Sequence, residues 1–143
     1  GYIACHKDFI EEMVKIHQYT ILCAPIMGQK AAIEAFRNGI KEIDKMRNEY
    51  DRRRRYIVKR TEEMGMDMVT PQGAFYAFPS VKKYGMSSDD FATGLLREKH
   101  VAVVPGTAFG DCGEGFIRCS YATSMPHIIE AFHRIEDYIS HLK

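Results

Sequence analysis

The chain has 143 residues, of which 45% are hydrophobic and 27% are charged, with a formal net charge of +1. This length suits one domain, or a small domain with an attached arm, whose core needs no disulfide or metal. The balanced charge gives no general case for a nucleic acid or an anionic membrane as a partner. No apolar run approaches the roughly 20 residues that span a bilayer. The four cysteines form no C-x-x-C pair, so we expect a reducing, cytoplasmic compartment.

Residues 1–5 (GYIAC) predict a short strand, and a strand needs a neighbouring strand for its backbone hydrogen bonds. No upstream residues of this chain supply one, so we expect the chain to be a piece of a longer protein. Residues 7–17 predict a helix, because Phe9, Met13 and Ile16 fall on one helical face.

A long helical pattern follows from about residue 28 to residue 64, with apolar side chains recurring every three or four positions. An unbroken helix of that length would measure on the order of 50 Å, which is more than one compact domain of this size needs. We therefore expect a helix that bridges two bodies, with Gly39 as a weak point or bend and Gly65 as the C-terminal stop.

The rest of the chain alternates between strands and helices joined by short turns. Strands are predicted at residues 67–69, 74–78, 101–104 and within 113–122, and helices at residues 88–100 and 126–142. This order predicts an α+β fold: a small mixed or antiparallel sheet with helices packed on one face, preceded by the long connecting helix.

Four consecutive arginines and six histidines could indicate a nucleic-acid site and a metal site, but their spacing does not support either function. The run from Arg52 to Arg55 points around most of a helix circumference, and acidic residues such as Glu49 and Asp51 flank it. This favours a solvated helix face over a nucleic-acid site. The six histidines lack the i, i+4 pairing with a carboxylate that marks a zinc helix, so no metal site is predicted.

Arg118 interrupts the apolar strand within residues 113–122, and a guanidinium among packed side chains needs a negative partner. Two partners are compatible with the sequence. A local carboxylate, Glu114 or Asp111, would give the arginine a structural role, and spacing alone favours this alternative. A bound carboxylate would make it a binding residue, because the planar fork of arginine holds a carboxylate in bidentate geometry. The preceding loop can bring Phe109 close to the guanidinium.

Four segments in this order, GYIA, PQGAFYAFPSV, VAVVPGTAFG and GFIRCSYA, resemble the C-terminal third of a class I/II aminotransferase of the aspartate aminotransferase fold. The similarity covers essentially the whole chain, and the last three segments are specific in combination. The resemblance implies that Arg118 binds the α-carboxylate of an amino-acid substrate. It also makes Gly73, Phe75, Tyr76 and Phe109 candidates to line the same cleft, with ordinary strand packing as the alternative for each.

The resemblance implies a division of the chain as well. Residues 1–45 would be the tail of the large cofactor domain with the first part of the connecting helix, and residues 46–143 the small C-terminal domain. The lysine, arginine and aspartate that hold pyridoxal 5'-phosphate would lie upstream, so no catalytic or cofactor-binding residue is expected within these 143 residues. The resemblance further implies a homodimer for the complete protein, and no activity for this chain alone.

Three alternatives stay open at this point. The chain could be a free-standing regulatory or interaction module that binds a carboxylate metabolite through Arg118, and a start codon just before Gly1 would favour it. The complete protein could be a C–S lyase of the same fold rather than an aminotransferase, which transfers an amino group between an amino acid and a 2-oxo acid. The four arginines could bind a polyanion, although we expect little such binding. The amino-acid donor is not identified by these residues.

Overall fold

The computed structural model describes residues 1–142. The chain divides into two compact units, one from Gly1 to Asp44 and one that begins at Lys45. We call them the N-terminal unit and the C-terminal unit. Helix α3 (Ile40–Glu63) starts in the first and continues into the second.

The N-terminal unit contains helices α1 (Lys7–Thr20) and α2 (Ile26–Asn38), and neither helix has a buried residue. Tyr2 packs edge-on against Phe36, with ring centroids 5.8 Å apart. The strand predicted at residues 1–5 is wrong. Residues 1–6 are irregular, because in the described part of the chain no other segment forms backbone hydrogen bonds with residues 1–5.

The long helical pattern of residues 28–64 forms two helices that are separated at Gly39, which confirms the predicted weak point. The Gly39 N–H donates to the Ala35 carbonyl at 2.9 Å, and a β-carbon at this position would lie 2.5 Å from the same oxygen. At its other end, α3 stops before Gly65, whose φ of +62° is a left-handed conformation that glycine adopts without strain.

The C-terminal unit is built on a three-stranded antiparallel sheet in the order β1-β3-β2. The strands are β1 (Tyr76–Ala77), β2 (Val104–Pro105) and β3 (Ile117–Ser120). Two of the predicted strands are thus much shorter than expected. The strand predicted at residues 67–69 does not form. The Ser80 N–H donates a hydrogen bond to the Asp67 carbonyl, and this one bond does not make a β-ladder.

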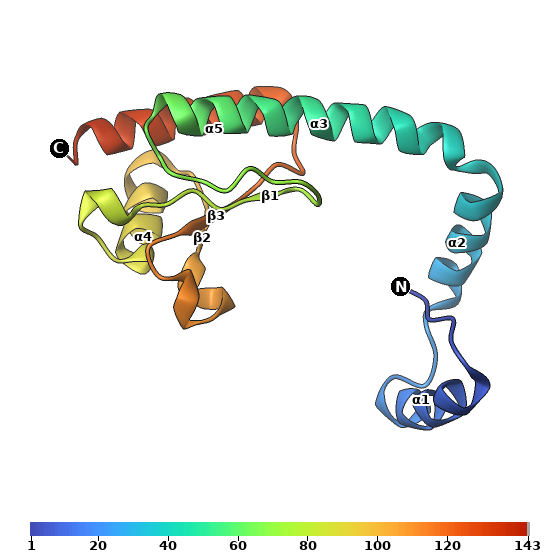
Figure 1. Cartoon of the computed structure of the whole chain (residues 1–143). Coiled ribbons are helices and arrows are strands. Elements are labelled where there is room, and N and C mark those ends of the chain that lie inside the picture. Colours follow the sequence, from blue (N-terminus) through green and yellow to red (C-terminus); the bar gives the residue numbers. More distant parts are fainter. Residues whose placement is uncertain (143) are drawn as a thin grey trace. The chain divides into compact units, whose positions relative to one another are not determined.

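Three helices supply the core on one face of this sheet, which confirms the predicted α+β class. They are the C-terminal part of α3, α4 (Ser88–Lys99) and α5 (Met125–Ser140). In Figure 1, α5 runs alongside the C-terminal part of α3, where Arg60 pairs with Glu136 at 2.7 Å. The core contains buried side chains from each of these helices and from β3: Ile57, Phe91, Leu95, Ile117, Phe132, Ile135 and Tyr138.

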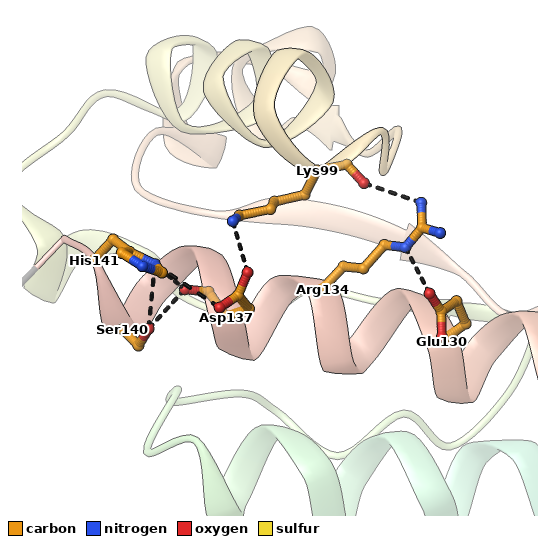
Figure 2. Close-up of polar contacts among 6 residues, drawn as sticks. All are labelled: Lys99, Glu130, Arg134, Asp137, Ser140 and His141. Carbon is orange, nitrogen blue, oxygen red and sulfur yellow. Dashed lines mark hydrogen bonds and ion pairs between the residues drawn. The ribbon is translucent and has the colours of Figure 1, made fainter.

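Helix α4 is fastened to α5 near its C-terminal end (Figure 2). The Lys99 ammonium pairs with Asp137 at 2.6 Å, and the Arg134 guanidinium donates to the Lys99 carbonyl at 3.2 Å. Arg134 also pairs with Glu130 at 2.8 Å. Hydrogen bonding from Lys99 lowers the pKa of Asp137 from its ordinary value. Polar contacts therefore hold the C-terminal end of α4 against α5.

Candidate functional site

Arg118 lies in the middle of β3, on the sheet face opposite to the core. Its neighbours Ile117 and Cys119 are buried on the helical side, and side chains alternate along a strand, so Arg118 points the other way. Aromatic rings from two segments flank its guanidinium. The Cζ atom is 4.4 Å from the ring centroid of Tyr76 on β1 and 4.4 Å from that of Phe109 in the preceding loop. This arrangement gives a cation–π contact with each ring.

No carboxylate of the described residues neutralises Arg118. The guanidinium takes part in no ion pair within residues 1–142, and its Nε is buried without a hydrogen-bond partner. The local alternative is therefore wrong. The Glu114 carboxylate instead accepts the backbone N–H of Ser88 at 2.9 Å. A buried N–H donor without an acceptor carries the full cost of its lost hydration, so Arg118 is suited to an acceptor from outside these residues.

The loop that brings Phe109 to Arg118 consists of two short 3-10 helices, η2 (Gly106–Phe109) and η3 (Asp111–Gly113). Their backbones approach so closely that a β-carbon on Gly106 would lie 1.9 Å from the Gly113 carbonyl oxygen. Phe109 packs edge-on against Phe78, with centroids 5.7 Å apart. Sequence reasoning missed Phe78, although it stands two residues after Tyr76 and two-residue alternation places both side chains on one face of a strand.

Two of the four candidate cleft residues contact Arg118, and the other two do so less directly or not at all. Tyr76 and Phe109 contact Arg118 directly. Phe75 is half-buried, and its ring centroid lies 4.7 Å from that of Tyr76 and 5.9 Å from that of Tyr50 on α3.

Gly73 lines a different pocket, of about 290 Å³, whose lining does not include Arg118. Side chains of α3 and the residue after β3 line that pocket with it, among them Tyr50, Arg54 and Tyr121.

The run of four arginines on α3 is only half solvated. Arg52 and Arg55 are exposed, whereas Arg53 and Arg54 are half-buried, and each of the four pairs with Glu49 or Asp51. Arg53 also donates to the Tyr121 carbonyl at 3.4 Å. The two half-buried arginines therefore pack against other parts of the C-terminal unit, a role that the expected solvated face did not include.

The described residues provide neither a cluster of metal ligands nor a membrane-spanning helix. No group of three or more His, Cys, Asp or Glu side chains is placed to hold a metal ion in this part of the chain. Among its helices, none combines the length and the apolar character that crossing a membrane requires.

Comparison with known proteins gives this fold and site a family. The model of the family "Aminotransferase class I and II" matches residues 1–135. The aspartate aminotransferase of Pyrococcus abyssi is 44% identical over 145 residues, which cover 100% of this chain and 37% of that protein. The YugH protein of Bacillus subtilis (strain 168) is 48% identical over 139 residues, covering 97% of this chain and 36% of YugH.

Solved structures agree with the sequence comparison. The aromatic aminotransferase of Pyrococcus horikoshii OT3 superposes with a TM-score of 0.86 at 44% identity, over 92% of this chain and 36% of that one. The chain therefore belongs to the class I and II aminotransferase family. It spans just over a third of the length of the relatives that it matches.

Proposed function

We propose that the complete protein is a pyridoxal-phosphate-dependent aminotransferase, which transfers an amino group between an amino acid and a 2-oxo acid. Arg118 binds the α-carboxylate of the substrate. The observation that carries this proposal is the state of Arg118: it lies between two aromatic rings, without an ion pair inside residues 1–142, and has a buried and unsatisfied Nε. Family membership supplies the reaction class.

An arginine at this position is better suited to bind a carboxylate than a lysine would be. The guanidinium offers N–H groups in a rigid fork that matches two carboxylate oxygens, and such charge-assisted pairs are about twice as strong as neutral hydrogen bonds. Tyr76 and Phe109 restrict the rotation of the side chain, so less conformational freedom is lost when a ligand binds. A carboxylate held at this point orients the rest of the substrate, and orientation of this kind accelerates a reaction by orders of magnitude.

The cofactor is assigned to residues outside this chain. Pyridoxal phosphate supplies the electron sink of the reaction when it is bound. In the C-terminal unit, two of the lysines already have structural partners. Lys83 donates to the carbonyls of Met64 and Gly65 at the end of α3, and Lys99 pairs with Asp137. We propose that the cofactor's lysine, its phosphate-binding arginine and its aspartate precede Gly1.

It follows that the 143-residue chain alone has no transaminase activity and binds no cofactor covalently. The purified chain, incubated with pyridoxal phosphate and reduced with borohydride, is expected to show no stoichiometric mass increase. A single lysine that is modified in full would contradict this part of the proposal.

We propose that residues 1–45 belong to the large cofactor domain and the connecting helix, and residues 46–143 to the small domain. The unit boundary at Lys45 and the absence of buried residues in α1 and α2 support this division. On the family resemblance we further propose a cytoplasmic homodimer, whose small domain closes on the substrate. Sedimentation of the complete protein tests the dimer.

The test of Arg118 compares two lysine substitutions in the complete protein. Arg118→Lys keeps the charge but loses the fork, and removing a charge-assisted hydrogen bond costs about 1.5–3 kcal/mol, which predicts a KM raised about 10- to 150-fold. Arg97→Lys, on the exposed face of α4, is the matched control and leaves KM unchanged. L-aspartate, L-glutamate and L-phenylalanine serve as donors. An unchanged KM for every accepted donor in Arg118→Lys would overturn the proposal.

A further inference from the structure

The loop that carries Phe109 is joined to the first turn of α4 by three hydrogen bonds. The Thr107 hydroxyl donates to the Asp89 carboxylate at 2.9 Å. The Gly115 N–H donates to the hydroxyl of Ser88 at 2.7 Å, and the Ser88 N–H donates to Glu114 at 2.9 Å. Ser88 is fully buried, so the bond from the Gly115 N–H to its hydroxyl is shielded from water, whereas the bond between Thr107 and Asp89 is exposed. Both ends of the loop are thus attached to the same turn of one helix.

Helix α4 is itself fixed, so it can serve as a support. Phe91 and Leu95 anchor its inner face in the core with no exposed surface. At the far end, the contacts of Lys99 with Asp137 and Arg134 fasten it to α5 (Figure 2). The inner face and the C-terminal end of α4 are therefore both held in place.

The first turn of α4 also binds a carboxylate from the loop. Glu114, four residues before Arg118, accepts the Ser88 N–H and makes no ion pair with Arg118 within residues 1–142. The N-terminus of a helix carries partial positive charge and unsatisfied N–H groups, which favour a carboxylate there. Glu114 is thus held at this helix end, and the Arg118 Nε has no hydrogen-bond partner among the described residues.

We propose that Thr107 is a positioning residue for Arg118. Its hydrogen bond to Asp89 fixes η2, and Phe109, at the end of η2, is thereby held against the guanidinium. Arg118 is then pre-organised for the carboxylate of the substrate. This inference rests on the proposed function, because it concerns the ligand that Arg118 is proposed to bind. Thr107 itself is not proposed to contact the substrate.

The matched substitutions are Thr107→Val and Thr107→Ser in the complete protein. Valine keeps the shape and removes the hydroxyl, whereas serine keeps the hydroxyl. Ordering one rotamer-rich side chain costs binding by roughly 2- to 10-fold, so Thr107→Val is expected to raise KM by that factor with kcat unchanged. The dissociation constant of 2-oxoglutarate, measured by calorimetry, is expected to rise by a similar factor. Thr107→Ser is expected to behave as the wild type.

Two controls separate positioning from general loss of structure. Thr93→Val removes an exposed hydroxyl from the same helix and leaves KM unchanged. Asp89→Ala removes the acceptor from an exposed side chain, and it is expected to reproduce the rise of Thr107→Val, which provides a second test if the valine variant folds poorly.

The decisive measurement is a double-mutant cycle with Arg118→Lys. If Thr107 acts through Arg118, Thr107→Val changes neither KM nor the 2-oxoglutarate dissociation constant further when Arg118 is already lysine. Effects that multiply independently would overturn the inference. So would a wild-type KM in both Thr107→Val and Asp89→Ala while Arg118→Lys raises KM, and that result would leave the proposed function standing. A wild-type KM in Arg118→Lys would instead overturn the proposed function.

Discussion

The two units share the same kind of helical pattern but differ in what the pattern achieves. In the N-terminal unit, Ile16 is 70% exposed and Phe36 is 69% exposed, and neither α1 nor α2 buries a residue. In the C-terminal unit, Ile57 is 1% exposed and Phe91 is fully buried. Periodic apolar residues are therefore sufficient to form a helix, whereas a core requires several elements that face one another.

The exposed apolar side chains of the N-terminal unit also indicate where it belongs in the complete protein. Large exposed apolar surfaces on a protein commonly mark the site of another domain or partner. The N-terminal unit has such surface, which supports its assignment to a larger domain. The C-terminal unit has three helices and a sheet around one core, and this core fixes the strand on which Arg118 lies.

The largest expected effect comes from truncating one phenylalanine in each unit. Phe91→Ala leaves a cavity in the core and is expected to lower the free energy of unfolding by about 3–5 kcal/mol. In the 143-residue chain, Phe36→Ala removes a largely exposed ring that packs edge-on against Tyr2, and it is expected to change this free energy by less than about 1 kcal/mol. Urea denaturation followed by circular dichroism measures both. Equal destabilisation by the two substitutions would show that the contrast between the units is wrong.

Alanine at one glycine of each unit gives effects of opposite sign. At Gly106 the new β-carbon would meet the Gly113 backbone, and overpacking of this kind costs about 1–3 kcal/mol. At Gly28 in α2 it would meet no atom within 4 Å, so higher helix propensity is expected to stabilise by about 0.5–1 kcal/mol. Thermal unfolding of the two variants distinguishes the signs. Stabilisation by Gly106→Ala would contradict the close approach in the Phe109 loop.

The reactivity of the cysteine thiols distinguishes buried from exposed positions in the two units. Burial raises the pKa of the Cys119 thiol to about 12, while Cys5, Cys23 and Cys112 are exposed. Because the thiolate is the reactive form, Cys119 is expected to resist a thiol-specific disulfide reagent near neutral pH until the chain unfolds. Mass spectrometry after labelling identifies the modified residues. Labelling of native Cys119 as fast as Cys112 would contradict the packing behind β3.

The smallest effect concerns the contact between α4 and α5. The Lys99 ammonium lowers the pKa of Asp137 below its ordinary value of 3.8, so the folded state binds this proton less readily than the unfolded state. The stabilisation is therefore complete above the ordinary value and is lost as the pH falls through the lowered one. Asp137→Asn is expected to be slightly less stable at neutral pH and to lose this part of the acid dependence. An unaltered acid-unfolding curve would show that the ion pair contributes nothing.

Sequence reasoning predicted the helices well, because local periodicity and local terminators determine them. The break at Gly39 and the helix beginning near Ser88 are examples. Strands were less predictable, since a strand exists only where a second segment pairs with it. Residues 1–5 and 67–69 have strand-forming side chains and no ladder.

The candidate site was predictable in part for the same reason. An arginine inside an apolar strand is visible in one segment, whereas its neighbours come from β1 and from a loop. The bonds of Ser88 and Thr107 join residues 18 to 27 positions apart and have no periodic signal, so sequence reasoning did not find them. Gly73 belongs to the same segment as Tyr76, yet the chain turns between them and places Gly73 in a pocket whose lining does not include Arg118.

The central claim is that Arg118 recognises a carboxylate, and one comparison tests it most directly. The complete protein and Arg118→Ala are each assayed for binding of L-phenylalanine and of 2-phenylethylamine, which differ by the carboxylate alone. We predict that Arg118→Ala weakens binding of the amino acid by about 30-fold or more, as expected when one partner of a buried charge pair is removed, and leaves binding of the amine unchanged. Equal weakening of both ligands, or of neither, would contradict the account.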